Sequence, residues 1–129
     1  PVALAFVDVD HFKQINDRHG HAVGDQLLAG LGQVLLGRSG EDDVAMRLGG
    51  EEFACLMPGA DAASARRHAE RIAKTYRDRH RAYASTLSIG IALQRPGETL
   101  ESLLSRADAA LYAAKRAGRD RVELAEGDA

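Results

Sequence analysis

A four-residue link between two apolar runs constrains the fold of this chain most. The runs occupy 43–48 and 53–57. The four residues between the runs are Gly49, Gly50, Glu51 and Glu52. Glycine reaches positive φ without steric cost, so the Gly-Gly pair predicts the two-residue turn of a β-hairpin. The two acids would then lie at the hairpin tip, where carboxylates 4 Å apart repel by up to about 4 kcal/mol. A cation bound at the tip would explain why they stand together.

Length, charge and cysteine content narrow the class of protein. The 129 residues suffice for one domain with a real core, and the net charge of −2 is not that of a protein that binds duplex nucleic acid. The longest purely apolar stretch, 2–7, has six residues, too few for a transmembrane helix or a signal peptide. We therefore expect neither nucleic acid nor membrane as a partner of this domain.

The single cysteine, Cys55, rules out an internal disulfide and fits a reducing compartment. We therefore expect a cytoplasmic domain, in a parent protein that can itself be anchored to a membrane. Cys55 lies within an apolar run and is interpreted as a core residue. His68 and His80 fall in a segment rich in Arg, Lys and Glu, so we expect both to be solvated. The same segment is interpreted as a solvated helix face, not a nucleic-acid site.

Strand-like and helix-like segments alternate along the chain. Continuous apolar runs predict buried strands, and apolar residues three or four apart predict helices. The expected order is a central strand at 2–7, helices at 12–18 and 23–35, the hairpin at 43–58, a helix from Asp61, a strand at 85–93, a helix capped by Thr99, and a strand at 121–125. The predicted core face of the helix from Asp61 is Ala65, Ala69, Ile72, Ala73 and Tyr76. The predicted core face of the helix after Thr99 consists of the apolar residues at positions 100, 103, 104, 107 and 111.

This order predicts an α+β fold, an α/β sandwich with a ferredoxin-like core. A central, mainly antiparallel sheet of about five strands would be flanked by helices.

Asp8 follows the apolar run 2–7, where an isolated charge would be costly to bury. One interpretation is structural: Asp8 or Asp10 caps a helix that starts near Phe12. The other is functional. If the hairpin pairs beside the first strand, Glu51 lies near Asp8, and carboxylate oxygens from two strands suit Mg²⁺ or Mn²⁺. Such a pair holds metal in phosphoryl and nucleotidyl transfer.

Four segments together resemble a known family. They are 6–25 (FVDVDHFKQINDRHGHAVGD), 47–53 (RLGGEEF), 86–90 (TLSIG) and 106–119 (RADAALYAAKRAGR). In this order and at these spacings they are similar to the GGDEF domain, the catalytic module of diguanylate cyclases, in its Gly-Gly-Glu-Glu-Phe variant. The resemblance covers nearly the whole chain. It implies an adenylyl-cyclase-like palm fold and the condensation of two GTP into cyclic di-GMP with release of two pyrophosphates.

The resemblance also implies which residues carry this chemistry. Asp8, the Val9 carbonyl and Glu51 would hold Mg²⁺ (or Mn²⁺), two ions per active half-site. Glu51 would also help to deprotonate the ribose 3′-hydroxyl. Glu52 keeps the acidic pair of the signature, and it either faces the metal or supports a group that does.

Guanine and phosphate contacts follow from the same resemblance. Asn16 and Asp25 would recognise guanine, because an amide and a carboxylate can accept from its N1–H and N2–H₂ groups. The phosphates would accept hydrogen bonds from backbone N–H groups at a helix start, those of His11, Phe12 and Lys13. Two cations near the last helix, Lys115 and Arg119, would add positive charge at the triphosphate. The alternative for the two cations is a helix C-terminus, where positive charge opposes the macrodipole.

The chain departs from the family at the inhibitory product site. Many members carry Arg-x-x-Asp there, with the Arg nine residues before the first signature Gly. Gly40 occupies the Arg position and Asp43 the Asp position. Glycine has no guanidinium fork, so we expect high-affinity feedback to be lost. If cyclic di-GMP still binds, the remaining candidate site is the active half-site, through Asn16 and Asp25.

The family segment before the first strand, and any sensor domain, are outside this sequence. We therefore expect 1–129 to be a single catalytic domain from a longer protein, weakly active alone. Catalysis would need a transient or regulated homodimer, with one GTP on each copy. The alternative function is a non-catalytic module that binds GTP or cyclic di-GMP and signals to a partner. The signature acids and the guanine-binding positions are present, which favours catalysis.

Overall fold

The computed structural model describes residues 1–38 and 40–128. They form a sheet of five strands in the order β2-β3-β1-β4-β5, antiparallel except for the parallel pair β4–β5. The elements, in chain order, are β1 (Val2–Val9), α1 (Phe12–His19), α2 (His21–Arg38), β2 (Val44–Gly49), β3 (Glu52–Pro58), α3 (Ala62–Arg79), a 3₁₀ turn (Arg81–Tyr83), β4 (Leu87–Leu93), α4 (Leu100–Arg116) and β5 (Arg121–Leu124). The predicted α+β fold with a central, mainly antiparallel sheet is confirmed.

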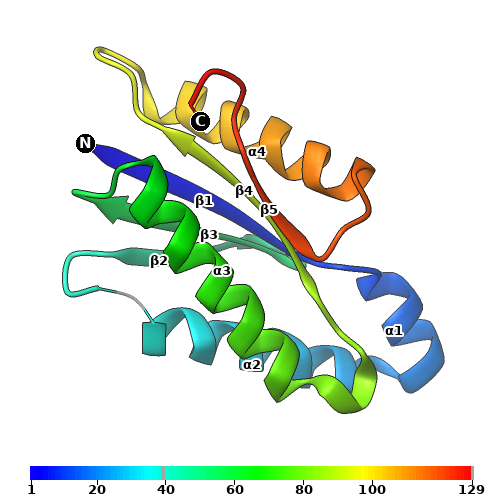
Figure 1. The fold of residues 1–129 in the computed structure, drawn as a ribbon. Helices are drawn as coiled ribbons and strands as arrows, with labels where there is room; N and C mark the ends of the chain where they lie inside the picture. The colour runs from blue at the N-terminus through cyan, green and yellow to red at the C-terminus, as the bar shows by residue number, and fades with distance from the viewer. Residues whose placement is uncertain (39, 129) are drawn as a thin grey trace.

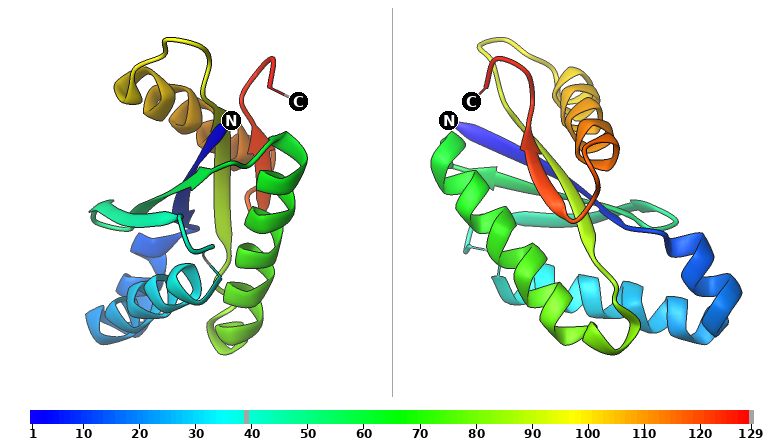
Figure 2. Two further views of the ribbon diagram at one scale, coloured as in Figure 1. Left: turned by 90° about the vertical axis from the view of Figure 1, so that its left-hand side faces the viewer. Right: turned by 45° about the vertical axis from the view of Figure 1, so that its right-hand side comes forward.

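β1 is the central strand, and helices cover both of its faces (Figures 1 and 2). Ala3, Ala5 and Val7 belong to the core under α2 and α3, whereas Leu4 and Phe6 belong to the core under α4. This alternation explains why the strand is apolar without interruption, since neither face meets water. It also places Asp8, the next even-numbered residue, on the α4 side of the sheet.

α3 begins at the predicted cap. The Asp61 carboxylate accepts from the Ser64 backbone N–H at 2.8 Å, and the Ser64 hydroxyl accepts from the Asp61 N–H at 3.0 Å. This reciprocal arrangement satisfies two groups that lack partners within the helix. The buried face of α3 is the predicted one: Ala65, Ala69, Ile72, Ala73 and Tyr76.

α4 packs unusually close to the sheet, at Gly90 of β4. A Cβ atom at Gly90 would lie 2.1 Å from the backbone nitrogen of Leu111 and 2.3 Å from the carbonyl oxygen of Ala107. Only glycine permits this approach. The prediction that Leu100 belongs to the core face of this helix is wrong: Leu100 is the first residue of α4, and it is 54% exposed. Small residues nearer the helix end are buried as well, at Ala110 and Ala114.

The predicted hairpin is confirmed, but its turn lies one residue later than expected. β2 runs through Gly49 and β3 begins at Glu52, so Gly50 and Glu51 form the link. Gly49 has a φ of 147°, which lets the ladder continue past the irregularity between Arg47 and Gly49. The Arg47 guanidinium closes the turn by donating to the Gly50 carbonyl at 2.8 and 3.1 Å.

The expectation that His68 and His80 are solvated is wrong. His80 is buried at the end of α3, where its Nδ1 lies 3.0 Å from the Tyr76 carbonyl oxygen and its ring covers Gly30 of α2. Burial lowers its pKa below the ordinary value. The His68 side chain is only 13% exposed, beside Asp43. Both histidines lie where α3 meets a neighbouring element.

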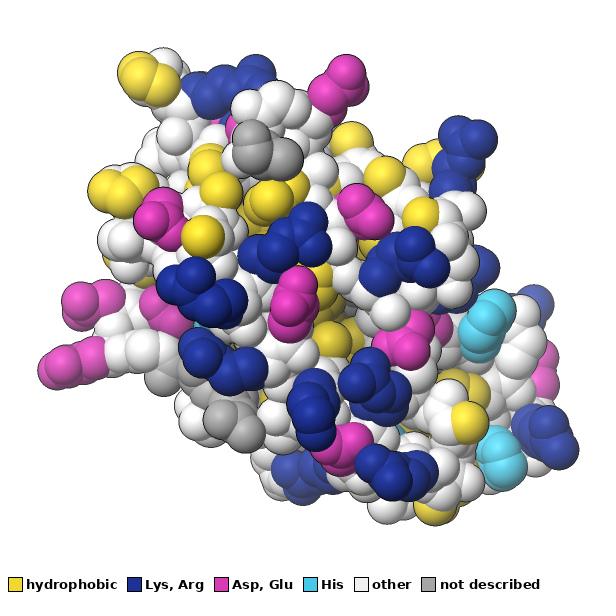
Figure 3. All heavy atoms as spheres, in the orientation of Figure 1, with side chains coloured by type: hydrophobic (Ala, Val, Ile, Leu, Met, Phe, Trp, Pro, Cys, Tyr) yellow, Lys and Arg dark blue, Asp and Glu magenta, His cyan; other side chains and the backbone are white. Residues whose placement is uncertain are grey.

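The outer face of α3 carries mixed charge, as expected. Figure 3 shows Lys and Arg side chains over this side of the molecule, with Asp and Glu among them. Lys74 and Arg81 both pair with Asp78, at 2.8 and 2.7 Å. None of the described helices is both long and apolar enough to span a lipid bilayer.

Candidate active site

The carboxyl end of β1 opens into a polar cavity of about 180 Å³. Four parts of the chain meet there: the end of β1, the start of α1, the hairpin turn and the end of α4 (Figure 1). The lining residues are Asp8, Val9, Asp10, His11, Phe12, Lys13, Gln14, Glu51, Lys115 and Arg119. The structure therefore brings together every predicted metal- and phosphate-binding residue.

Asp8 lies at the centre of this cavity and is only 4% exposed. Its Oδ2 atom accepts a hydrogen bond from the Lys115 ammonium, whereas its buried Oδ1 atom has no hydrogen-bond partner among the described residues. Burial raises the pKa of Asp8 and outweighs Lys115, which lowers it; Glu51 and Glu52 raise it further. A buried carboxylate oxygen that no described residue satisfies, near two more carboxylates, fits a divalent cation.

The two signature acids take different places. Glu52 stands directly opposite Asp8 in the β1–β3 register and is exposed. Glu51 lies in the turn, is partly buried and lines the cavity. The sequence predicts Glu51 near Asp8 if the hairpin pairs beside the first strand, and the structure places both acids close enough to raise the pKa of Asp8.

The loop from β1 into α1 turns sharply at His11. His11 has a φ of 54°, in the left-handed region, and α1 begins at Phe12. The interpretation of Asp8 or Asp10 as the cap of this helix is wrong, because His11 holds the cap position and makes no side-chain cap hydrogen bond. The first N–H groups of a helix have no acceptor within it. Those of α1 belong to residues that line the cavity, Phe12 and Lys13 among them.

Asp10 is a site-organising residue that sequence reasoning did not identify. It is 3% exposed and accepts from the Thr86 hydroxyl at 2.7 Å, the Ser88 hydroxyl at 2.6 Å and the Asp120 backbone N–H at 3.0 Å. It thereby fixes the loop after α4, where Arg119 and Asp120 both have positive φ. The signal was present in the sequence as hydroxyls two residues apart, which share one face of a strand.

The two cations predicted for phosphate both line the cavity. Lys115 lies in the last turn of α4, where the macrodipole also favours a positive charge. Its ammonium also donates a hydrogen bond to Asp8, a contact that a role at the helix end alone would not explain. Arg119 follows the helix end and is partly buried.

The guanine candidates lie beside one another, away from the polar cavity. The Asn16 amide rests on α2 at Gly24, where a Cβ atom would come within 1.8 Å of its Oδ1. That oxygen is buried and has no hydrogen-bond partner among the described residues. Asp25, the next residue after Gly24, is exposed.

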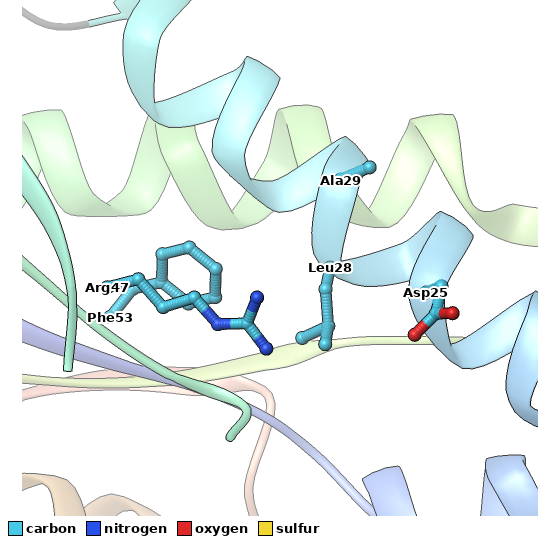
Figure 4. A pocket seen from close by; sticks show the side chains of 5 residues that line it. All are labelled: Asp25, Leu28, Ala29, Arg47 and Phe53. Carbon is cyan, nitrogen blue, oxygen red and sulfur yellow. The ribbon is translucent and has the colours of Figure 1, made fainter. Parts of the chain in front are cut away.

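Asp25 lines a separate hollow of about 310 Å³ between α2 and the hairpin. Its other lining residues are Leu28, Ala29, Arg47 and Phe53. Figure 4 shows Leu28 between the Arg47 guanidinium and the Asp25 carboxylate, with the Phe53 ring behind Arg47. Of the predicted site residues, the metal- and phosphate-binding ones therefore line the polar cavity and Asp25 lines this second hollow, whereas Asn16 and Glu52 line neither.

Comparison with known proteins places this geometry in a family. Residues 1–121 match the sequence model of the family described as diguanylate cyclase, GGDEF domain. The diguanylate cyclase VdcA of Vibrio cholerae is 39% identical over 129 residues, which cover 94% of this chain and 38% of that protein. This chain spans well under half the length of the curated relatives that we compared.

Solved structures agree with the sequence match. The GGDEF domain of DgcB from Caulobacter crescentus, in complex with c-di-GMP, superposes with a TM-score of 0.91 at 40% identity, covering 98% of this chain and 78% of that one. The active GGEEF domain of a diguanylate cyclase from Vibrio cholerae gives a TM-score of 0.90 at 29% identity, covering 97% and 83%.

Proposed function

We propose that this chain, which belongs to the GGDEF family of diguanylate cyclase domains, condenses two GTP molecules into cyclic di-GMP and two pyrophosphates. The observation that carries the proposal is the polar cavity, which Asp8 lines together with Glu51, Lys115 and Arg119 and where a buried Asp8 oxygen has no hydrogen-bond partner within the described part of the chain. Relatives named diguanylate cyclase and a related domain bound to c-di-GMP support it.

Asp8, the Val9 carbonyl and Glu51 would hold Mg²⁺ or Mn²⁺, with two ions in each half-site. When bound, the ions would supply Lewis-acid stabilisation of the charge that develops on the pyrophosphate. The Lys115 ammonium now compensates the Asp8 carboxylate. We propose that it turns to the triphosphate when metal and nucleotide bind, since two cations would then compete for one carboxylate.

The N–H groups at the start of α1 and the Arg119 guanidinium would bind the β- and γ-phosphates. Asn16 and Asp25 would accept hydrogen bonds from the guanine edge. The buried Asn16 oxygen, which finds no hydrogen-bond partner in residues 1–38 and 40–128, supports this assignment, because guanine would supply the missing donor. Adenine lacks an N1–H, so the Asp25 carboxylate would favour GTP over ATP.

Each chain offers one GTP site, so the reaction needs two copies facing each other across a two-fold axis. The ribose 3′-oxygen of each GTP attacks the α-phosphorus of the other, so that two phosphodiester bonds form and two pyrophosphates leave, and Glu51 of each copy helps to take up the 3′-hydroxyl proton. The dimer makes this step effectively intramolecular. We propose that 1–129 is one catalytic domain of a longer protein, in which the other parts set the dimer geometry.

Product feedback through the usual inhibitory site would be weak. The Gly40 backbone N–H donates to the Asp43 carboxylate at 2.9 Å, and glycine offers no side chain for guanine or phosphate. Product would instead bind through Asn16 and Asp25, at the active half-site.

The test is incubation of concentrated chain with GTP and Mg²⁺, followed by separation of the products. We expect cyclic di-GMP from the wild type and a rate lower by about 100-fold or more from Glu51→Gln, because removing even an outer partner of a metal ligand costs up to about 100-fold. Glu41→Gln, which removes an exposed acid away from the cavity, should behave as wild type. GTP binding without cyclic di-GMP, also by the longer protein, would instead support the non-catalytic module.

A further inference from the structure

A second cluster of metal-ligating side chains lies on the opposite side of the sheet from Asp8. We propose that Asp43, Cys55 and His68 form a binding site for Zn²⁺. This site is separate from the cavity around Asp8, and metal binding there does not depend on cyclase activity. It rests on three different elements that meet in one place.

The three ligand atoms converge although their residues are distant in sequence. Each residue offers one ligand atom, and these atoms lie within 4.8 Å of one another; His68 Nε2 and Asp43 Oδ2 are 3.8 Å apart. Cys55 stands opposite Ala45 in the β2–β3 register. Asp43, two residues before Ala45, therefore lies on the same face as Cys55, which is the face that α3 covers with His68.

The spacing is close to that of a tetrahedral zinc site. Zn–S bonds of about 2.3 Å and Zn–N or Zn–O bonds of about 2.0–2.1 Å place neighbouring ligand atoms roughly 3.3–3.6 Å apart. Side-chain shifts of a few tenths of an ångström to about 1 Å would therefore close the cluster around an ion. With three protein ligands, the fourth position would be left for water.

The three ligands differ in burial, which leaves a route for an ion from solvent. Cys55 is fully buried, whereas the Asp43 and His68 side chains are each 13% exposed. Asp43 and His68 also line an open hollow of about 320 Å³, together with Gly40, Met57, Ala60, Ser64 and Arg71. An ion would enter from this hollow and reach the thiolate beneath it.

Charge and orientation also fit the cation. A Cys55 thiolate and an Asp43 carboxylate together balance a divalent charge, although Arg71 at the hollow adds a positive charge that opposes binding. The Gly40 backbone N–H, 2.9 Å from Asp43 Oδ2, holds the carboxylate in orientation, as outer partners of metal ligands do.

The ligand types decide which metal binds. Thiolate and imidazole favour Zn²⁺, whereas Mg²⁺ takes oxygen ligands and keeps much of its water. The catalytic cavity offers oxygen ligands and this cluster offers sulfur, nitrogen and oxygen, so the two sites would take different ions. A bound Zn²⁺ would tie the start of the edge strand β2 to α3.

The experiment is titration of the reduced chain with Co²⁺ alone, followed by competition with Zn²⁺. Because Cys55 is the only cysteine, a thiolate-to-cobalt charge-transfer band in the near ultraviolet reports this site and no other. We expect the band to saturate at one Co²⁺ per chain and to vanish when Zn²⁺ is added.

Asp43→Asn and His68→Gln should each weaken Co²⁺ binding by more than about 100-fold, the upper end of the loss caused by removing an outer partner. Asp42→Asn and His21→Gln, which change exposed residues of the same types, should bind as wild type. Circular dichroism would establish that each variant is folded before titration. A folded wild type without the band, or a band that both cluster variants retain at full affinity, would overturn the proposal.

Discussion

The Lys115 ammonium pairs with the Asp8 carboxylate although 107 residues separate them in the chain. Close packing explains the pair. Asp8 lies opposite Ser88 in the β1–β4 register. Two residues further along β4, Gly90 packs directly against the backbone of α4 at Leu111. Lys115 lies one helical turn beyond Leu111, so it reaches over the end of β1. The geometry of the polar cavity around Asp8 therefore depends on a glycine outside it.

Loss of the Lys115 ammonium should affect both stability and catalysis. Lys115→Met leaves the buried Asp8 carboxylate without its cation, so we expect the free energy of unfolding to fall by about 1–3 kcal/mol. Cyclic di-GMP formation should fall about 100-fold if Lys115 also binds the triphosphate. Urea unfolding and a product assay measure the two effects. Arg116→Met, on the exposed side of the same helix, is the matched control; equal values for both variants would argue against the role of Lys115.

Gly90→Ala tests whether α4 must touch the sheet. The added Cβ would collide with two backbone atoms that cannot rotate away, at 2.1 and 2.3 Å. We expect a loss of at least about 1–3 kcal/mol in unfolding free energy, and a lower rate of product formation because α4 carries Lys115.

Gly37→Ala is the control for Gly90→Ala, and it should raise the free energy of unfolding instead of lowering it. Gly37 lies in α2 with open space around its Cβ position, so alanine should stabilise the chain by about 0.5–1 kcal/mol. If Gly90→Ala were as stable as wild type in the same unfolding experiment, the close approach of α4 would not be needed.

Much of this fold follows from local sequence patterns. The cap at Asp61 and the five buried residues of α3 were predicted because side-chain capping and helical periodicity are short-range effects. The hairpin was predicted from its glycines, but the turn is shifted because Gly49 can extend the strand through an irregular register. Such a shift depends on the irregular pairing of β2 with β3, which the glycine pattern alone does not specify.

The contacts that join distant segments were harder to predict. The placement of Lys115 on Asp8 required the packing of α4 on Gly90, and the bonds from Thr86, Ser88 and Asp120 to Asp10 required three elements at once. His68 and His80 were assigned to solvent from the charge of their helix, although each faces a neighbouring element. Residue type and spacing do not indicate which face of a helix a neighbouring strand or helix covers.

Asp25 should control guanine binding and product binding together. We expect Asp25→Ala to weaken the binding of GTP and of cyclic di-GMP by about 10–100-fold, the equivalent of the 1.5–3 kcal/mol typical of hydrogen bonds to a charged group. Calorimetric titration with each ligand measures this. Asp17→Ala removes an exposed acid from the neighbouring helix as a control. Tight product binding that persists unchanged in Asp25→Ala would place the product elsewhere.

Glu98 should make stability depend on acid pH. Arg106 donates to its two oxygens at 2.7 and 2.8 Å and holds the pKa of Glu98 at about 2, below the ordinary 4.5. Because the pKa is lower in the folded state, the ion pair stabilises fully above pH 4.5, and this contribution is lost as the pH falls toward about 2.

Urea unfolding of wild type and Glu98→Gln across this range tests the ion pair. The difference in unfolding free energy should shrink steadily as the pH falls from 4.5 to about 2. Glu101→Gln, an exposed acid in the first turn of α4, should show a smaller dependence. A wild-type advantage that stays constant over the whole range would rule out Glu98 as its source.

The rate of cyclic di-GMP formation as a function of chain concentration tests the central claim most directly. If two copies, each with GTP in the cavity around Asp8, must meet, the rate per chain should rise about twofold when the concentration of dilute chain is doubled, by mass action. Asp8→Asn should abolish product at every concentration. A rate per chain that does not change with concentration, or product formation by Asp8→Asn equal to that of the wild type, would contradict the account.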